Sequence, residues 1–279
     1  NRYQASGFEV CGTLAPQLDS NNALPPAAER SFAVNDTAGT WSWGGLTGRE
    51  ACIHPTTGAV VLRQPFGGMG QSAFGPGIKP GGPSYVAQLM DFQGIADPDG
   101  FDLANEKLKA LATRVPSVEP ALRSYVKQAH DEFNGEKEHL RLLGQDNLRR
   151  YRSIERLCIC LHADDTKYEI AARIGAAHAV GCTVSITGTG AEDWRDFAHV
   201  VAEPAVKKFD RLRYATPTRV PEAIRRAANE ACIHIADTPV LTDGRLELLW
   251  YVEEQSLSND YHRCGNLGPR FEEQRNGPV

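Results

Sequence analysis

The chain has 279 residues, and this length allows either one large hydrophobic core or two modest ones, of which we expect two. Its 30 Lys and Arg residues against 35 Asp and Glu residues give a formal net charge of -5. That balance gives no electrostatic reason to expect nucleic acid or an anionic membrane as a partner. No run approaches the roughly 18 apolar residues of a membrane span, so the sequence predicts no transmembrane segment.

The seven cysteines are scattered without a C-x-x-C pair, and the histidines are widely spaced. An odd number of cysteines in this arrangement indicates neither a disulfide framework nor a zinc site. We therefore expect a cytoplasmic protein with reduced thiols and no bound metal.

The first hundred residues contain the most informative stretch of the chain. Residues 1–50 mix Gly, Pro, Ser and Asn without a clear period and form an unassigned leader, whereas 57–63 is a short β-branched run that predicts a strand. This strand leads into 64–85, where seven glycines surround Lys79. Glycines leave bare N–H groups where a ligand can approach, which favours a binding loop, although a long surface loop has the same composition.

The next segment, 101–148, is predicted to be a helical connector. Between 102 and 143 the apolar residues recur mostly at helical spacing, with a break at Pro116 and Pro120, and this pattern predicts two helices. Residues 144–147, Gly-Gln-Asp-Asn, have the composition of a turn.

A strand, a helix and a second strand are predicted within residues 154–186. The apolar run 154–162 indicates a buried strand, Asp164 or Asp165 lies where a helix N-cap is expected, and Gly181 ends the helix before a strand at 182–186. A strand, a helix and a strand within so few residues favour a βαβ unit with parallel strands.

The rest of the chain continues this alternation. We expect a helix over 194–201, a strand over 211–215, a helix from Pro221 to Glu230 and a strand over 232–235. The fold class is therefore α/β, with 149–279 forming a doubly wound, Rossmann-like C-terminal domain.

The first strand-to-helix turn of this domain argues against a dinucleotide site. It contains Asp164 and Asp165 and lacks G-x-G-x-x-G, whereas a pyrophosphate needs glycines at a helix N-terminus. Gly188 and Gly190, after the second strand, form a weaker candidate, so a nucleotide-binding enzyme that uses them stays open as a third hypothesis.

Several segments resemble a known family. Residues 56–70, Thr-Thr-Gly-Ala-Val-Val-Leu-Arg-Gln-Pro-Phe-Gly-Gly-Met-Gly, and 79–85, Lys-Pro-Gly-Gly-Pro-Ser-Tyr, resemble the C-terminal end of the aldehyde dehydrogenase superfamily. More narrowly, they resemble the L-glutamate γ-semialdehyde (pyrroline-5-carboxylate) dehydrogenase module of the bifunctional proline utilization A family. Segments 144–151, 244–251 and 254–266 resemble the extra C-terminal domain of the longer members.

The resemblance implies the NAD-dependent oxidation of glutamate semialdehyde, a small molecule that carries an α-carboxylate. It places Gly81 and Gly82 where backbone amides hold that carboxylate, which agrees with the physical use of bare amides for anions. Ser72 is expected to add a hydroxyl, and Phe66 and Phe74 to contact the aliphatic part of the substrate. Residues 51–100 are then the aldehyde dehydrogenase segment with the substrate-anchor loop.

The resemblance also implies that the catalytic machinery lies outside this sequence. The family's catalytic cysteine is part of an upstream Gly-Gln-x-Cys motif, and NAD is bound mainly outside this chain. Cys52 is interpreted as a buried structural residue. We therefore expect a C-terminal fragment, inactive alone, that needs no cofactor of its own. FAD is expected only if a proline dehydrogenase module precedes it.

The partners expected are the rest of the dehydrogenase chain, which the C-terminal domain would cover as a noncatalytic lid, and a further copy in a homo-oligomer. The alternative is a free-standing, noncatalytic Rossmann-like binding or scaffold protein.

Overall fold

The structure of the chain is a computed structural model that describes residues 65, 75–92, 99–202, 205–260 and 272–275. Between residues 4 and 42 it describes the backbone of four short strands, and for 145 and 257–260 the backbone alone. The helices are α2 (Glu106–Arg114), α3 (Glu119–Gln128), α4 (Lys167–Ala179), α5 (Glu222–Glu230) and α6 (Gly244–Glu247). The strands are β1 (Gln4–Ala5), β2 (Phe8–Glu9), β3 (Ala33–Asp36), β4 (Gly39–Ser42), β5 (Gln145–Ser153), β6 (Arg156–Leu161), β7 (Thr183–Gly188), β8 (His199–Val200), β9 (Arg211–Arg213), β10 (His234–Ala236) and β11 (Val252–Asp260).

A five-stranded parallel sheet forms the centre of the C-terminal half, in the order β10-β9-β6-β7-β8. Strand β6 pairs with β7 from Arg156 opposite Thr183 to Leu161 opposite Gly188, and α4 connects the two. The predicted α/β class and the parallel βαβ unit are confirmed.

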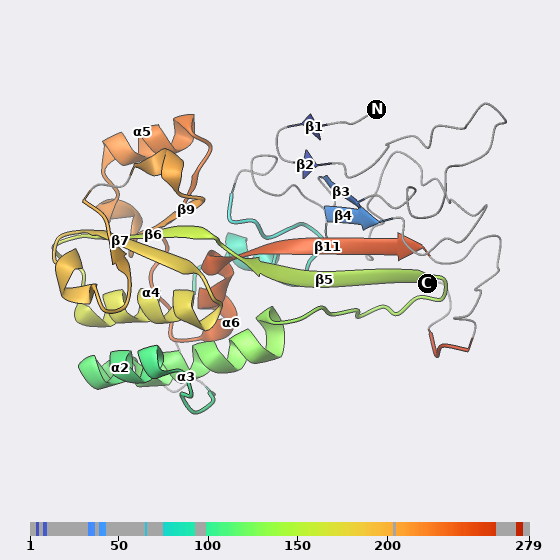
Figure 1. The fold of residues 1–279 in the computed structure, drawn as a ribbon, viewed down its shortest axis with the longest axis horizontal. Helices are drawn as coiled ribbons and strands as arrows, with labels where there is room; N and C mark the ends of the chain where they lie inside the picture. The colour runs from blue at the N-terminus through green and yellow to red at the C-terminus, as the bar shows by residue number, and fades with distance from the viewer. Residues whose placement is uncertain are drawn as a thin grey trace.

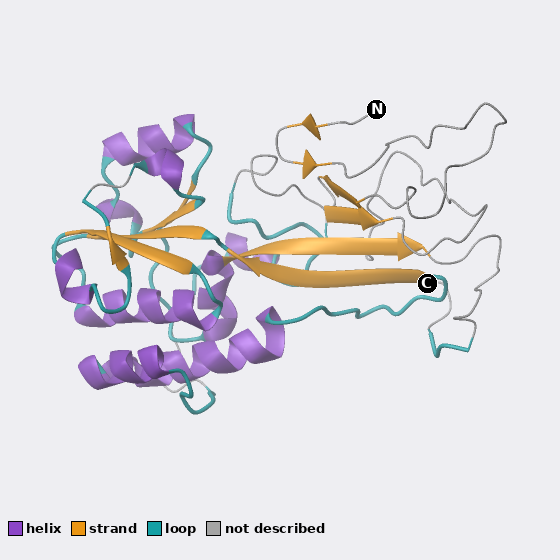
Figure 2. Cartoon of the chain, viewed as in Figure 1, coloured by secondary structure: helices purple, strands orange, loops and turns teal. Residues whose placement is uncertain are grey.

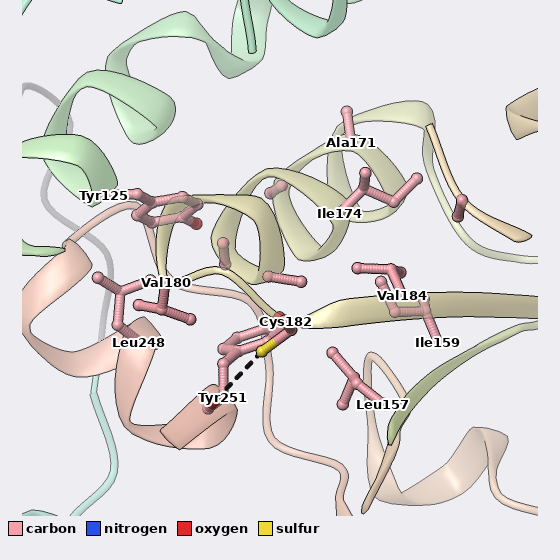
Figure 3. Close-up of a cluster of buried hydrophobic side chains, with 14 of the residues drawn as sticks. Tyr125, Leu157, Ile159, Ala171, Ile174, Val180, Cys182, Val184, Leu248 and Tyr251 are labelled. Atoms are coloured by element: carbon pink, nitrogen blue, oxygen red, sulfur yellow. Dashed lines mark hydrogen bonds between the residues drawn. The ribbon is translucent and has the colours of Figure 1, made fainter. Parts of the chain in front are cut away.

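Helices cover both faces of this sheet, with α2, α3 and α4 on one side and α5 on the other (Figure 1). Along β6 the side chains alternate: Leu157 and Ile159 join the larger apolar cluster, whereas Cys158 and Cys160 join the cluster beside α5. Strands buried on both faces have continuous apolar runs, which explains the sequence of β6. Figure 3 shows part of the larger cluster, in which the Cys182 thiol donates to the Tyr251 carbonyl at 3.3 Å.

The N-terminus of α4 is fixed by a capping box. The Thr166 hydroxyl accepts from the Glu169 N–H at 3.1 Å, and the Thr166 N–H donates to the Glu169 carboxylate at 2.7 Å. The prediction of Asp164 or Asp165 as N-cap is wrong, because Asp165 is paired with Arg173 and Arg219 instead. Helix α4 ends at Ala179, and Gly181, two residues later with φ +82°, stops it as expected.

The two helices predicted between 102 and 143 are present as α2 and α3. Pro116 begins a short 3-10 turn between them, and Pro120 lies in the first turn of α3, where proline needs no hydrogen-bond donor. By contrast, the helix predicted over 194–201 is wrong: a 3-10 turn at Ala191–Trp194 is followed by a turn over 195–198 and then by β8.

A second sheet contains the antiparallel pair β5 and β11, which extends away from the parallel sheet (Figures 1 and 2). The predicted turn at 144–147 is wrong from Gln145 onward, because β5 begins there. Glu254 lies opposite Tyr151, and Ser256 opposite Arg149, so these four side chains share one face. Within the described residues, no helix is long and apolar enough to cross a membrane.

The capping box gives a test of the α4 assignment. Thr166→Ala removes the acceptor for the Glu169 N–H and is expected to lower the free energy of unfolding by about 1 kcal/mol. The matched control is Thr113→Ala in the last turn of α2, where the exposed hydroxyl donates to the Lys109 carbonyl within the same helix; alanine has the higher helix propensity, and stability should be unchanged or slightly higher. Urea denaturation measures both variants, and equal effects would contradict the cap.

Candidate functional site

The candidate site is the glycine turn, which we define as Lys79, Pro80, Gly81 and Gly82. The Gly82 N–H donates to the Lys79 carbonyl at 3.1 Å, and Gly81 has φ +81°. Proline in the second position and glycine at positive φ in the third are the residues that a type II β-turn requires. Gly81 is exposed, and among the described residues its N–H has no hydrogen-bond acceptor.

A carboxylate from β11 holds the underside of this turn. The Lys79 N–H donates to Glu254 Oε2 at 2.9 Å, and the Glu254 N–H donates to the Gly77 carbonyl at 2.8 Å. A Cβ atom on Gly82 would lie 2.4 Å from Glu254 Oε1, so this glycine is needed for the carboxylate to approach. The Glu254 side chain is fully buried.

Arg211, at the start of β9, fixes the residues just before the turn. Its Nη2 donates to the Pro76 carbonyl at 2.8 Å, while its Nη1 donates to the carbonyls of Trp250 at 2.9 Å and Val252 at 3.2 Å. One buried guanidinium therefore joins the parallel sheet, the beginning of β11 and the loop. Burial lowers the pKa of Arg211 to about 10, and the charge of Glu253 acts in the opposite direction.

Ser84 connects the turn to β5 and α6. Its hydroxyl shares a hydrogen bond of 3.1 Å with the Tyr151 hydroxyl and accepts from Arg245 Nη2 at 3.0 Å. Arg149, beside Tyr151 on the same face, pairs with Glu132 at 3.0 Å. The loop 76–84 thus has hydrogen-bond partners in β5, β9, β11 and α6.

The charged side chains that act on the buried Glu254 carboxyl group are cationic. Burial raises the pKa of the Glu254 carboxyl, and the positive charges of Arg149, Lys79 and Arg245 only partly oppose this shift. Burial likewise raises the pKa of the Tyr151 hydroxyl, with the Glu254 charge adding to the effect. Two of these cations also have an ion-pair partner of their own, because Arg149 and Arg245 pair with Glu132 at 3.0 Å and 3.5 Å.

The crevice at the carboxyl ends of β6 and β9 is the place where a Rossmann-like sheet binds a nucleotide, because the strand order reverses there. Arg173, fully buried, lies in this position and donates to the carbonyls of Cys160 at 3.1 Å and Arg213 at 3.5 Å. Asp165 pairs with Arg173 and, at 2.8 Å, with Arg219.

These residues do not fit NAD in this crevice. The N-terminal amide of Glu169 is bonded to Thr166, the buried Asp165 lies in the turn, and Arg173 bonds to backbone carbonyls in the crevice. A pyrophosphate would need free amides and close backbone approach at this point. Gly188 and Gly190 both have positive φ, but a Cβ on Gly188 would lie 2.2 Å from the Leu161 carbonyl, so this glycine permits strand packing.

The structure places some of the predicted site residues and not others. Gly81 and Gly82 form the exposed turn, although the Gly82 N–H is used within the turn itself. Phe66, Ser72, Phe74 and Cys52 lie outside the described residues. Among the residues described, no group of three His, Cys, Asp or Glu side chains could hold a metal ion.

Sequence reasoning missed Glu254 and Arg211 as neighbours of the glycine loop. Both lie in segments without a binding motif, and Glu254 is separated from Lys79 by 175 positions. The sequence marked this region in two ways: 254–266 resembles the family's extra domain, and the charged residues around Glu254 are typical of a structural ion-pair network.

The fold and site together define an α/β protein with a Rossmann-like sheet and an exposed glycine turn. Over 74% of its length the chain is similar to proline utilization A from Corynebacterium freiburgense, with 30% identity and a TM-score of 0.58. The predicted resemblance to that protein is therefore confirmed. The chain covers 20% of the length of this relative.

Other solved structures are less similar. Histidinol dehydrogenase from Elizabethkingia anophelis matches 50% of this chain and 40% of its own at 13% identity, with a TM-score of 0.33. A variant of 1-pyrroline-5-carboxylate dehydrogenase from Thermus thermophilus matches 47% of this chain and 30% of its own, at 13% identity and a TM-score of 0.31. No protein-family model and no curated protein matches the chain.

The raised pKa of Glu254 predicts a pH-dependent difference between the protein and its Glu254→Gln variant. The folded state binds the proton of Glu254 more tightly than the unfolded chain, where the pKa is about 4.3. The stability from this group is therefore fully present below the unfolded pKa and is lost as the pH rises through the folded pKa. Glutamine cannot ionise, so the variant should gain stability relative to the wild type as the pH rises above about 4.

Urea unfolding of both proteins across this pH range measures the difference. Glu155→Gln, at a side chain that is 76% exposed, provides the baseline. The free energy of unfolding of Glu254→Gln minus that of the wild type should increase with pH. If this difference stays constant or decreases, the raised pKa of Glu254 is contradicted.

Proposed function

We propose that this chain is part of an NAD-dependent L-glutamate γ-semialdehyde (pyrroline-5-carboxylate) dehydrogenase of proline catabolism, in which the glycine turn anchors the substrate's carboxylate. The single observation that carries this proposal is the Gly81 amide. It is exposed, it has no acceptor among the described residues, and it belongs to a turn whose other side is fixed. The similarity to proline utilization A supports the substrate class.

A free amide at a rigid turn is suited to an anion because its dipole is already oriented. The positive charges of Lys79, Arg149 and Arg245 offset part of the negative charge of Glu254. The aldehyde end of the substrate would then point away from the turn, toward the catalytic cysteine of the upstream module. Gly82 closes the turn, and Gly81 would donate to the carboxylate.

NAD, when bound by the complete enzyme, accepts the hydride of the aldehyde carbon. We place it mainly outside this chain, in agreement with the poor fit of the crevice at β6 and β9. FAD enters only if a proline dehydrogenase module belongs to the same protein. The residues of this chain bind and orient the substrate and take no part in the bond-breaking step.

We assign the C-terminal half to a noncatalytic lid or assembly role in a cytoplasmic enzyme. A separate contact is proposed for the segment directly after the glycine turn, where Val86, Leu89 and Met90 are 64%, 78% and 57% exposed. Large apolar side chains gathered at one place on a surface mark a contact with another protein surface. In this proposal their partner is the rest of the dehydrogenase chain.

The proposal predicts a selective effect of Gly81→Ala in the longer protein that contains this chain. Alanine is strained at φ +81°, so the amide would no longer be held toward the carboxylate. We expect the KM for glutamate semialdehyde to rise about tenfold, the value of one hydrogen bond to a charged group, with little change for an aldehyde that lacks a carboxylate. Steady-state NADH production measures both substrates.

Gly135→Ala is the matched control, because Gly135 has the same φ of +81° and an added Cβ would have no atom within 4 Å. It should leave both KM values unchanged. Absence of semialdehyde oxidation by the longer protein, or equal effects on both substrates, would refute the proposed function. Turnover by the 279-residue chain alone, abolished by Cys52→Ala, would refute the assignment of catalysis to another module.

A further inference from the structure

The loop that carries the glycine turn is fixed by residues from the C-terminal half of the chain. The Glu254 carboxylate accepts from the Lys79 N–H, and Arg211 donates to the Pro76 carbonyl. Both side chains are buried and come from β11 and β9, far from the loop in sequence. A loop held by buried charged hydrogen bonds keeps one conformation more strongly than a loop held by surface contacts.

Glu254 is the side chain that acts on the turn itself. It contacts the turn at two points, through the Lys79 N–H and through the space left by the missing side chain of Gly82. Its own N–H holds the Gly77 carbonyl at 2.8 Å, so strand and side chain act on the same segment. The positive charges of Arg149, Lys79 and Arg245 act on this carboxylate and offset part of its repulsion of an anion on the exposed side of the turn.

From this geometry we infer that Glu254 is a positioning residue for the substrate's carboxylate, a role that rests on the proposed function of the glycine turn. Glu254 holds Lys79, Lys79 and Gly82 close the turn, and the closed turn presents the Gly81 N–H. When the turn is held in this way, the substrate does not have to order it on binding. The C-terminal half therefore contributes to substrate recognition in addition to its proposed role as a lid.

The first test compares substrates in the longer protein. Glu254→Ala should raise the KM for glutamate semialdehyde about tenfold while kcat, and the KM for an aldehyde without a carboxylate, stay within about twofold. Glu254→Gln keeps an oxygen that can accept from the Lys79 N–H, so it should restore the KM to within about twofold of the wild type. Glu155→Ala, at an exposed glutamate, is the matched control and should change neither value.

The second test is a double-mutant cycle on the chain itself and does not depend on catalysis. Gly82→Ala should destabilise the protein, because its Cβ would lie 2.4 Å from Glu254 Oε1. In the Glu254→Ala background the same change should cost much less, because the carboxylate is gone. Additive effects of the two changes would overturn the contact on which the inference depends.

The outcomes separate this inference from the proposed function. If Gly81→Ala raises the KM for the semialdehyde selectively but Glu254→Ala does not, the positioning role is wrong and the function stands. If Glu254→Ala fails to fold, Glu254→Gln decides: equal losses for both aldehydes would show a merely structural role and overturn the inference. If the longer protein oxidises no semialdehyde, the proposed function fails, and the cycle still reports on the contact.

Discussion

The buried carboxylate of Glu254 is the constraint on which the candidate site depends. A carboxyl group that loses its water on burial must recover the lost interactions from hydrogen bonds and nearby charges. Here the Lys79 N–H and the charges of Arg149, Lys79 and Arg245 restore part of them, and the pKa of the Glu254 carboxyl group remains raised. The strand that carries it is in turn held by Arg211, which binds the carbonyls at the start of β11. The glycine turn and β11 consequently form one unit.

A second buried network sets the position of that unit on the parallel sheet. Arg213 of β9 pairs with Glu247 of α6 at 2.9 Å, and the Tyr251 hydroxyl donates to the same carboxylate at 2.8 Å. Although burial opposes its charge, the pKa of Arg213 is raised, because Glu247 and Tyr251 favour the charged form. The Tyr125 hydroxyl of α3 also donates to the Leu241 carbonyl. The network joins the sheet to α6 and to the residues that precede β11, so changes in this buried network would reach the site through β11.

The parts of the fold that depend on local pattern could be predicted from the sequence. The apolar runs around Ile159 and Ile186 and the helix between them have a periodicity that does not depend on distant residues, and the resemblance in 56–85 located the glycine turn. The predicted N-cap of α4 is wrong because the Asp165 carboxylate forms ion pairs with Arg173 and Arg219, and Arg219 is distant in the sequence.

The other half of the site could not be predicted in the same way. In β11, Glu254, Gln255 and Ser256 are buried polar residues, so the strand shows no apolar alternation. The burial of Glu254 depends on a partner 175 positions away. The many glycines of the loop indicate room for a ligand to approach the backbone. In the structure, Gly77 and Gly82 are also required because the side chains of Glu253 and Glu254 pack against them. Composition alone does not separate the two reasons.

Hydrogen exchange at the Lys79 amide tests most directly the claim that Glu254 fixes the glycine turn. In the wild-type chain this buried N–H, bonded to Glu254 at 2.9 Å, should exchange slowly. In Glu254→Ala, the amides of 77–82 should exchange faster, while those of β6 and α4 keep their protection. Unchanged protection at Lys79 in that variant would contradict the account, because the turn would then be held by something other than the carboxylate.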